Sequence, residues 1–127
     1  MLHGMERNPR DHLFGEHIRA LRQASLLHDP TFSVRQLAAR VGVEPSYLSK
    51  VERGLEPPPS EPRVLALAAA LGEDPDVLLA LAGKVSAELL RVIRARPQLF
   101  AQLLRELKDL PDHAVLRIVR EVRDGPW

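Results

Sequence analysis

Apolar residues recur at spacings of three and four along most of the chain, and no alternating apolar–polar run exceeds a few residues. Spacing of three and four is typical of amphipathic helices, whereas alternation would indicate strands. Glycines and prolines divide the pattern into segments, because both residue types end helices. The sequence therefore predicts an all-α protein. Its eight predicted helices span residues 10–26, 34–41, 45–53, 62–71, 74–82, 85–95, 97–107 and 111–123.

These helices fall into two groups, preceded by a short segment without periodicity. Residues 1–9 are expected to be a flexible leader, and residues 10–83 carry five helices that form one domain. Gly83-Lys84 marks the boundary to residues 84–127, which carry three short helices separated by prolines. A tail of this size does not build a stable core alone, so it must pack on the first domain or on a second copy of the chain.

Length and composition limit the class of protein further. A chain of 127 residues allows one domain, or a small domain with an appendage. The absence of cysteine excludes a disulfide scaffold, a thiolate zinc site and a thiol nucleophile. No signal-peptide pattern opens the chain, and its apolar runs are far shorter than the ~20 residues of a membrane helix. We therefore expect a cytoplasmic protein.

The five histidines and the acidic residues form no catalytic or metal-binding pattern. His12 and His17 lie about 140° apart around a helix, so they cannot share a ligand face. The glycines are scattered, most of them at predicted helix ends, and form no phosphate-binding loop. Glu52 and Glu56 have no partner histidine or nucleophile nearby in the sequence, and Glu52 is instead expected to brace the domain through a buried hydrogen bond. We expect no enzymatic activity, no metal and no cofactor.

Residues 34–53, VRQLAARVGVEPSYLSKVER, predict two short helices joined by a tight turn at Gly42. The small side chain of Ala38 allows the helices to approach closely, and Gly42 permits the backbone conformation of the bend. Such a pair leaves the outer face of its second helix free to enter the major groove of DNA. The apolar positions that hold the pair together are Leu37, Ala38, Val41, Val43, Leu48 and Val51.

The free face and its flanks carry side chains suited to DNA. Lys50 can donate to guanine O6 and N7, and serine hydroxyls can donate or accept at a base edge. Tyr47 offers either its hydroxyl to a phosphate or its ring to a thymine methyl. Basic and amide side chains at the flanks suit phosphates, which position a protein without reading sequence. The alternative is that all these residues are merely solvated. The outer-face candidates are Glu44, Ser46, Tyr47, Ser49 and Lys50. The phosphate candidates are Arg35, Gln36, Arg53 and Arg63.

Residues 14–83 resemble the phage-repressor and Cro-like helix-turn-helix family, also called the Xre family. The resemblance implies a five-helix domain that binds double-stranded DNA through residues 45–53 as recognition helix. Val34 departs from the pattern, since the family commonly has a phosphate-contacting glutamine there. The matching residues are Ser33, Leu37-Ala38, Val41-Gly42-Val43, Ser46, Leu48-Ser49-Lys50-Val51-Glu52-Arg53-Gly54, Pro59-Ser60 and Leu67-Ala68-Ala69-Ala70-Leu71-Gly72.

The amphipathic tail predicts a dimerisation module. Domains of this kind bind operators with two half-sites, which a two-fold symmetric dimer matches. We therefore expect a homodimer on a palindromic operator, although the apolar stripes of the tail could also pack within one monomer. The candidate dimerisation residues are Leu99, Leu103, Val115, Ile118, Val119 and Val122.

The whole chain, and residues 102–112 in particular, is similar to the DdrO family, repressors of the DNA-damage response in radiation-resistant bacteria. The resemblance implies repression at palindromic promoter sites. It also implies inactivation by an IrrE-type metallopeptidase, here through a cut between Leu104 and Arg105, with the metal belonging to the peptidase. The alternative from another class is an antitoxin-like interaction regulator, whose tail neutralises a partner protein while its helix-turn-helix domain regulates its own gene.

The net charge of +1 is unusually low for a DNA-binding protein. It is divided unevenly, with +1 on residues 1–72, −3 on residues 73–83 and +3 on residues 84–127. Residues 1–72, which include the predicted recognition helix, are barely basic, which predicts modest non-specific affinity. A monomer should therefore bind poorly, and dissociation of the dimer should be enough to release DNA.

Overall fold

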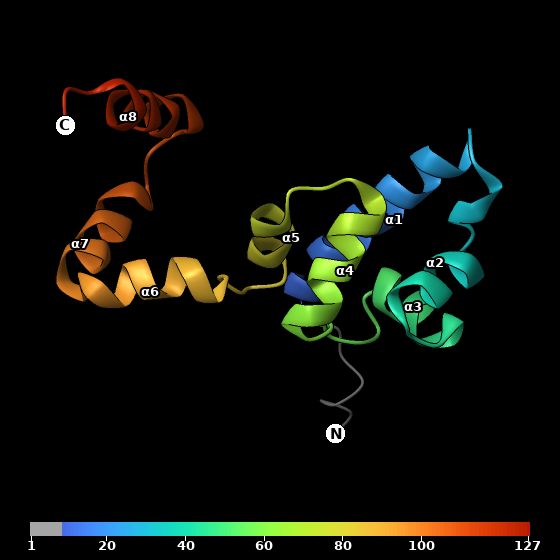
Figure 1. Cartoon of the computed structure of the whole chain (residues 1–127). Helices are drawn as coiled ribbons and strands as arrows, with labels where there is room; N and C mark the ends of the chain where they lie inside the picture. The colour runs from blue at the N-terminus through green and yellow to red at the C-terminus, as the bar shows by residue number, and fades with distance from the viewer. Residues whose placement is uncertain (1–8) are drawn as a thin grey trace. The chain divides into compact units, whose positions relative to one another are not determined.

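The computed structural model describes residues 9–127, with side chains from His12 onward (Figure 1). The predicted leader lies outside the described residues, except for Pro9, which begins the first helix. The described part is all-helical, as predicted. Its elements are α1 (Pro9–Leu26), the 3-10 turn η2 (Pro30–Phe32), α2 (Val34–Val41), α3 (Pro45–Glu52), α4 (Glu61–Leu71), α5 (Pro75–Leu81), α6 (Ala87–Ala95), α7 (Pro97–Leu107) and α8 (Asp112–Asp124).

The turn η2 is the element that the periodicity did not predict. Asp29 caps it by accepting hydrogen bonds from the backbone N–H of Thr31 at 2.9 Å and from its hydroxyl at 2.7 Å. The same bonds lower the pKa of Asp29. Three residues are too few to show a helical period, so only such local polar contacts reveal the turn.

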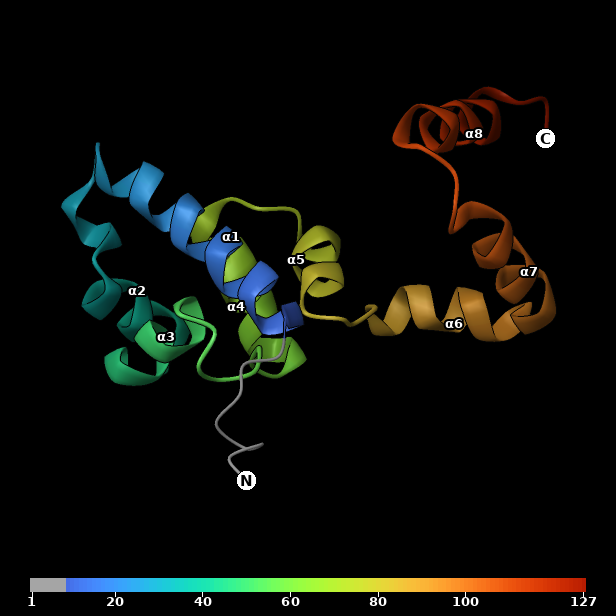
Figure 2. The ribbon, with the colours of Figure 1, turned by 180° about the vertical axis from the view of Figure 1, so that it is seen from behind.

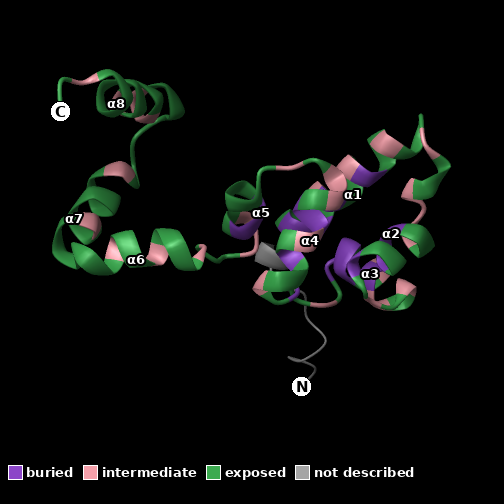
Figure 3. Ribbon diagram, in the orientation of Figure 1, coloured by how far each residue is buried: buried purple, intermediate pink, exposed green. Residues whose placement is uncertain are grey.

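The chain divides into two compact units after Ser86. The first unit contains α1 to α5, and α1 packs against α3, α4 and α5 while α2 packs against α3 and α4 (Figures 1 and 2). All of the buried apolar residues in the described chain belong to this unit (Figure 3). They are Phe14, Ile18, Leu37, Ala38, Val41, Leu48, Val51, Val64, Leu67, Ala68, Leu78 and Leu79.

The backbone of α1 passes directly against the backbone at the end of α3, and a glycine in α1 makes this close approach possible. A Cβ atom added to Gly15 would lie 2.2 Å from the carbonyl oxygen of Val51 and 2.9 Å from that of Glu52. Neither backbone oxygen can rotate away as a side chain would. Gly15 therefore sets how closely α3 rests on the rest of the domain.

The second unit contains α6 to α8 and has no buried residue of its own (Figure 3). Its helices are strongly amphipathic, yet their apolar side chains are either exposed to solvent or only half-buried. An entirely apolar groove runs along α7 and α8. It is lined by Leu103, Leu107, Val115, Ile118, Val119, Val122 and the stem of Arg123. No helix in the described residues is both long and apolar enough to cross a membrane.

Candidate nucleic-acid interface

Helices α2 and α3 form the predicted pair, joined at Gly42. The hydroxyl of Ser33 caps α2 by accepting a hydrogen bond of 3.2 Å from the N–H of Gln36. Gly42 ends the helix with a φ of 76°, in the left-handed region that favours glycine, and Val43 N–H then donates to the Ala38 carbonyl at 3.0 Å. The predicted apolar positions of the pair are buried, or packed on the core in the case of Val43.

The outer face of α3 combines exposed polar side chains with one half-buried ring. Glu44, Ser46 and Lys50 are exposed, and Ser49 is half-buried. Tyr47 packs part of its ring against the core, which leaves less of the ring for a thymine methyl than the sequence suggested. Burial raises the pKa of the Tyr47 phenol, and the Glu56 carboxylate adds to this effect while Arg63 opposes it. The phenol therefore keeps its proton as a hydrogen-bond donor at neutral pH.

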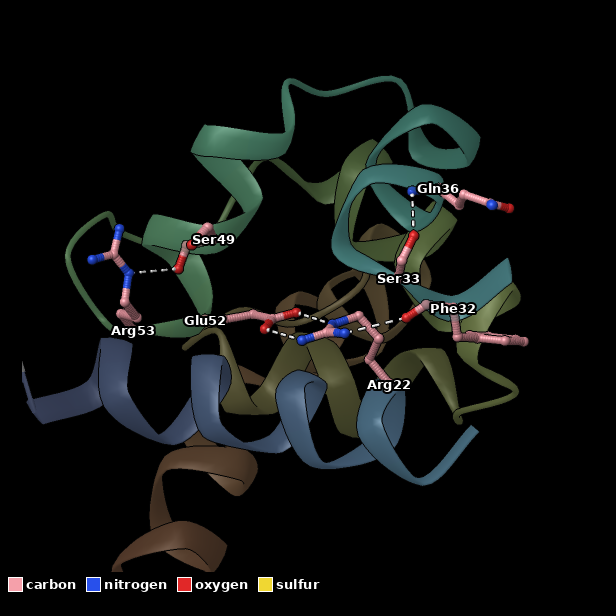
Figure 4. Close-up of polar contacts among 7 residues, drawn as sticks. All are labelled: Arg22, Phe32, Ser33, Gln36, Ser49, Glu52 and Arg53. Carbon is pink, nitrogen blue, oxygen red and sulfur yellow. Dashed lines mark hydrogen bonds and ion pairs between the residues drawn. The ribbon is translucent and has the colours of Figure 1, made fainter. Parts of the chain in front are cut away.

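The phosphate candidates on α2 and α3 lie on the solvent side of their helices. Arg35 and Gln36 are exposed in the first turn of α2. The Nε of Arg53 donates to the Ser49 carbonyl at 3.3 Å, which directs the Arg53 side chain back along the last turn of α3 (Figure 4). The contacts of Arg35, Gln36 and Arg53 with DNA stay predictions.

The fourth phosphate candidate, Arg63, has a partner inside the protein. Its Nη1 donates a 2.7 Å hydrogen bond to the carbonyl oxygen of Val41, in the last turn of α2. Arg63 belongs to the first turn of α4. The contact therefore joins α4 to the end of α2, directly beside the turn.

Glu52 braces the domain, as the sequence predicted. Its carboxylate is buried and accepts two hydrogen bonds from Arg22, at 2.7 Å from Nε and 2.9 Å from Nη2 (Figure 4). The partner was not identified from sequence, although Arg22 continues the buried spacing of Phe14 and Ile18 along α1. A cation on a buried stripe is rarely left unpaired, and this signal could have revealed it.

Arg22 also donates to the carbonyl of Phe32 at 3.2 Å, so one side chain joins α1, η2 and α3. No side-chain nitrogen or oxygen buried within the described residues lacks a hydrogen-bond partner. The described part also contains no group of three or more His, Asp or Glu side chains placed to hold a metal ion.

Residues 13–81 match the family model described as a helix-turn-helix domain, which is more than half of the chain. The chain belongs to the helix-turn-helix family. No curated protein and no solved structure matched the chain. As a helix-turn-helix protein, the chain is a DNA-binding regulator. The matched residues run from α1 to the end of α5. Helices α6 to α8 lie beyond the match.

Proposed function

We propose that the chain is a transcriptional repressor that binds a palindromic operator as a homodimer. The observation that carries this proposal is the two-sided character of α3. Its inner face is fixed by the buried Leu48, Val51 and Glu52, while Ser46 and Lys50 point outward from the same two turns. A helix held rigidly on one side and polar on the other is what reading of the major groove requires.

In this function α3 lies in the major groove and α2 crosses the backbone. Lys50 donates to guanine O6 and N7, and Ser46 contacts a base edge near the start of the helix. Arg35 and Gln36 contact phosphates at the first turn of α2, where backbone N–H groups also favour anions. Arg53 contacts a phosphate at the far end of α3. These contacts set the register of the helix on the duplex.

The tail supplies the second half of the proposal. The exposed apolar side chains along α6, α7 and α8, together with the groove of α7 and α8, support pairing with a second copy, because monomeric proteins seldom leave large contiguous apolar faces in water. The five-helix domain that holds α3, residues 10–83, carries a net charge of −2, so one copy gains little from non-specific attraction to phosphates. Two linked copies bind an operator with two half-sites far more tightly than one.

On the resemblance of its sequence to DdrO repressors, the proposed role is regulation of the DNA-damage response, with inactivation by an IrrE-type metallopeptidase. The proposed bond, Leu104–Arg105, lies within α7. Leu104 is 58% exposed, and Arg105 is exposed as well. A cut there separates α8 and part of the apolar groove from the rest of the chain, which would remove the dimer and its hold on DNA.

Selection of bound sites from random-sequence duplex DNA tests the proposal. The purified full-length chain should enrich one palindrome. Lys50→Ala and Ser46→Ala should relax the preference at particular base pairs, each by roughly 1–3 kcal/mol. Gln23→Ala, an exposed change on α1, is the matched control and should enrich the same palindrome as the wild type.

Enrichment of no common palindrome would overturn the assignment of α3 as recognition helix. Sedimentation of the same preparation separates the repressor from the antitoxin-like alternative. A repressor of the proposed kind is a dimer by itself, whereas an antitoxin-like regulator requires a protein partner to order its tail.

A further inference from the structure

The turn between α2 and α3 is held by a side chain from a third helix. Val41 is the last residue of α2, and carbonyls in a final helical turn lack a partner within their own helix. The guanidinium of Arg63 supplies that partner through the 2.7 Å bond from Nη1. Bonds from a charged donor are roughly twice as strong as neutral ones.

The same guanidinium also covers the turn glycine. A Cβ atom added to Gly42 would lie 2.5 Å from Nη1 of Arg63, so the charged group occupies the space beside the bare α-carbon. Arg63 thereby contacts both the last residue of α2 and the residue at which the chain changes direction toward α3.

We propose that Arg63 is a positioning residue for DNA binding, which fixes the turn at Gly42 and so the direction of α3, in place of the phosphate contact that its sequence suggested. The inference rests on the proposed function of α3. Loss of the guanidinium leaves the Val41 carbonyl without its partner and lets the turn open. The fraction of molecules in which α3 has the orientation that binds DNA then falls, and the apparent affinity for DNA falls with it.

The electrostatic surroundings of Tyr47 agree with this placement. Arg63 is close enough to lower the phenol pKa against the larger effects of burial and Glu56. Because Tyr47 lies in the first turn of α3, the guanidinium is near the beginning of the recognition helix as well as the end of α2. The single arginine therefore acts on both sides of the turn.

The test compares Arg63→Met with Arg35→Met in the full-length chain. Arg35 is the matched control, because it is an exposed arginine of α2 and a predicted phosphate contact. Affinity is measured across a range of salt concentrations, on random-sequence duplex DNA and on any duplex that the wild type enriches. The slope of log K against log salt concentration counts the phosphates neutralised, so loss of one contact reduces it by about 1.

If the turn is ordered in only about a fifth of the Arg63→Met molecules, their DNA affinity should be roughly fivefold lower than that of the wild type at every salt concentration. The slope should be unchanged. Arg35→Met should reduce the slope by about 1. Amide hydrogen exchange of Gly42 and Val43 should accelerate in the Arg63 variant and not in the Arg35 variant. Arg63→Gln, which is uncharged but retains N–H donors, provides the slope measurement should the methionine variant fail to fold.

A slope reduced by about 1 in either Arg63 variant, with Gly42 and Val43 exchange unchanged, would overturn the inference and make Arg63 a phosphate ligand. Unchanged affinity would also overturn it. Failure of the wild-type chain to bind either duplex would instead contradict the proposed function. The exchange of Gly42 and Val43 would still report whether Arg63 holds the turn.

Discussion

Arg22 of α1 and Glu52 at the end of α3 form a buried, two-bond ion pair. Their side chains are only 8% and 4% exposed. The pair fixes α3, the proposed recognition helix, to α1, and the further bond from Arg22 to the Phe32 carbonyl holds the segment that leads into α2. The Arg22 side chain therefore contacts both the segment that precedes α2 and the end of α3.

Substitution of only one residue of this pair should lower the free energy of unfolding more than substitution of both. Arg22→Met or Glu52→Leu alone leaves a buried charge without its counter-ion, which typically costs about 3–5 kcal/mol. The double variant places apolar groups together and should lose much less than the sum of the two. Urea unfolding of the full-length chain at one fixed protein concentration, followed by circular dichroism, measures all three variants. Additive losses would show that the two side chains act independently.

Gly15→Ala should destabilise the protein, which is opposite to the usual effect of this change in a helix. Alanine in place of an interior glycine ordinarily stabilises a helix by about 0.5–1 kcal/mol. Here the new Cβ would lie 2.2 Å from the Val51 carbonyl oxygen, so α1 and α3 must move apart. Overpacking of this kind costs roughly 1–3 kcal/mol. Thermal unfolding measures the loss, and DNA affinity should fall with it.

Ala20→Gly is the companion to Gly15→Ala, because Ala20 is exposed on the same helix. It should cost only the helix-propensity difference and leave DNA affinity unchanged. A neutral or stabilising Gly15→Ala would contradict the close approach of α1 to α3 at this position.

The helices and the core of the DNA-binding domain could be predicted from the sequence because they depend on local signals. Ser33 and Gly42 cap the two ends of α2 and Pro45 begins α3, and the spacing of Leu37, Val41 and their neighbours defines one buried face. The buried role of Glu52 could also be predicted, since its position in the helix faces inward. Each of these inferences needs only residues within one or two helical turns.

The partners of these residues could not be predicted in the same way, because they lie far away in the sequence. Arg22 and Glu52 are 30 residues apart, and Arg63 and Val41 are 22 apart. Arg63 is exposed and basic, so its sequence context suggests a phosphate contact equally well. Only the folded arrangement of α2 and α4 reveals the carbonyl to which it donates.

A contact between His17 and Glu73 should make stability depend on pH. Nε2 of His17 donates to the Glu73 carboxylate, which also accepts from the N–H of Asp74, and the first bond contributes most to a Glu73 pKa below its usual 4.5. A carboxyl with a lowered folded-state pKa contributes stability in full above its unfolded pKa. That contribution is lost as pH falls through the folded pKa.

Glu73→Gln should therefore be less stable than the wild type at pH 7, and the difference should disappear in acid below the folded pKa of Glu73. Unfolding by urea at a series of pH values measures the difference. Glu16→Gln removes an exposed carboxylate from α1 and should change stability little at pH 7. A Glu73→Gln deficit that persists unchanged in acid would mean that the Glu73 charge is not its origin.

The apolar groove of α7 and α8 should be the place where dimers are disrupted most easily. Leu103→Asp or Ile118→Asp places a charge on a face that the proposed partner covers, and an unpaired charge at such an interface is strongly unfavourable. Sedimentation should show a monomer for both variants. His113→Ala, on the exposed surface of α8, should remain dimeric. Dimers that withstand both aspartate substitutions would place the contact elsewhere.

Truncation after Leu104 should leave the DNA-binding domain folded while operator affinity is lost. The buried core of the described chain lies entirely within α1 to α5, so removal of the end of α7 and all of α8 takes away no core residue. The shortened chain should be a monomer with an unchanged unfolding midpoint of its N-terminal domain. Its remaining affinity should be that of one five-helix domain, which carries no net positive charge, at a single half-site. Tight operator binding by a truncated dimer would exclude cleavage at Leu104–Arg105 as the switch.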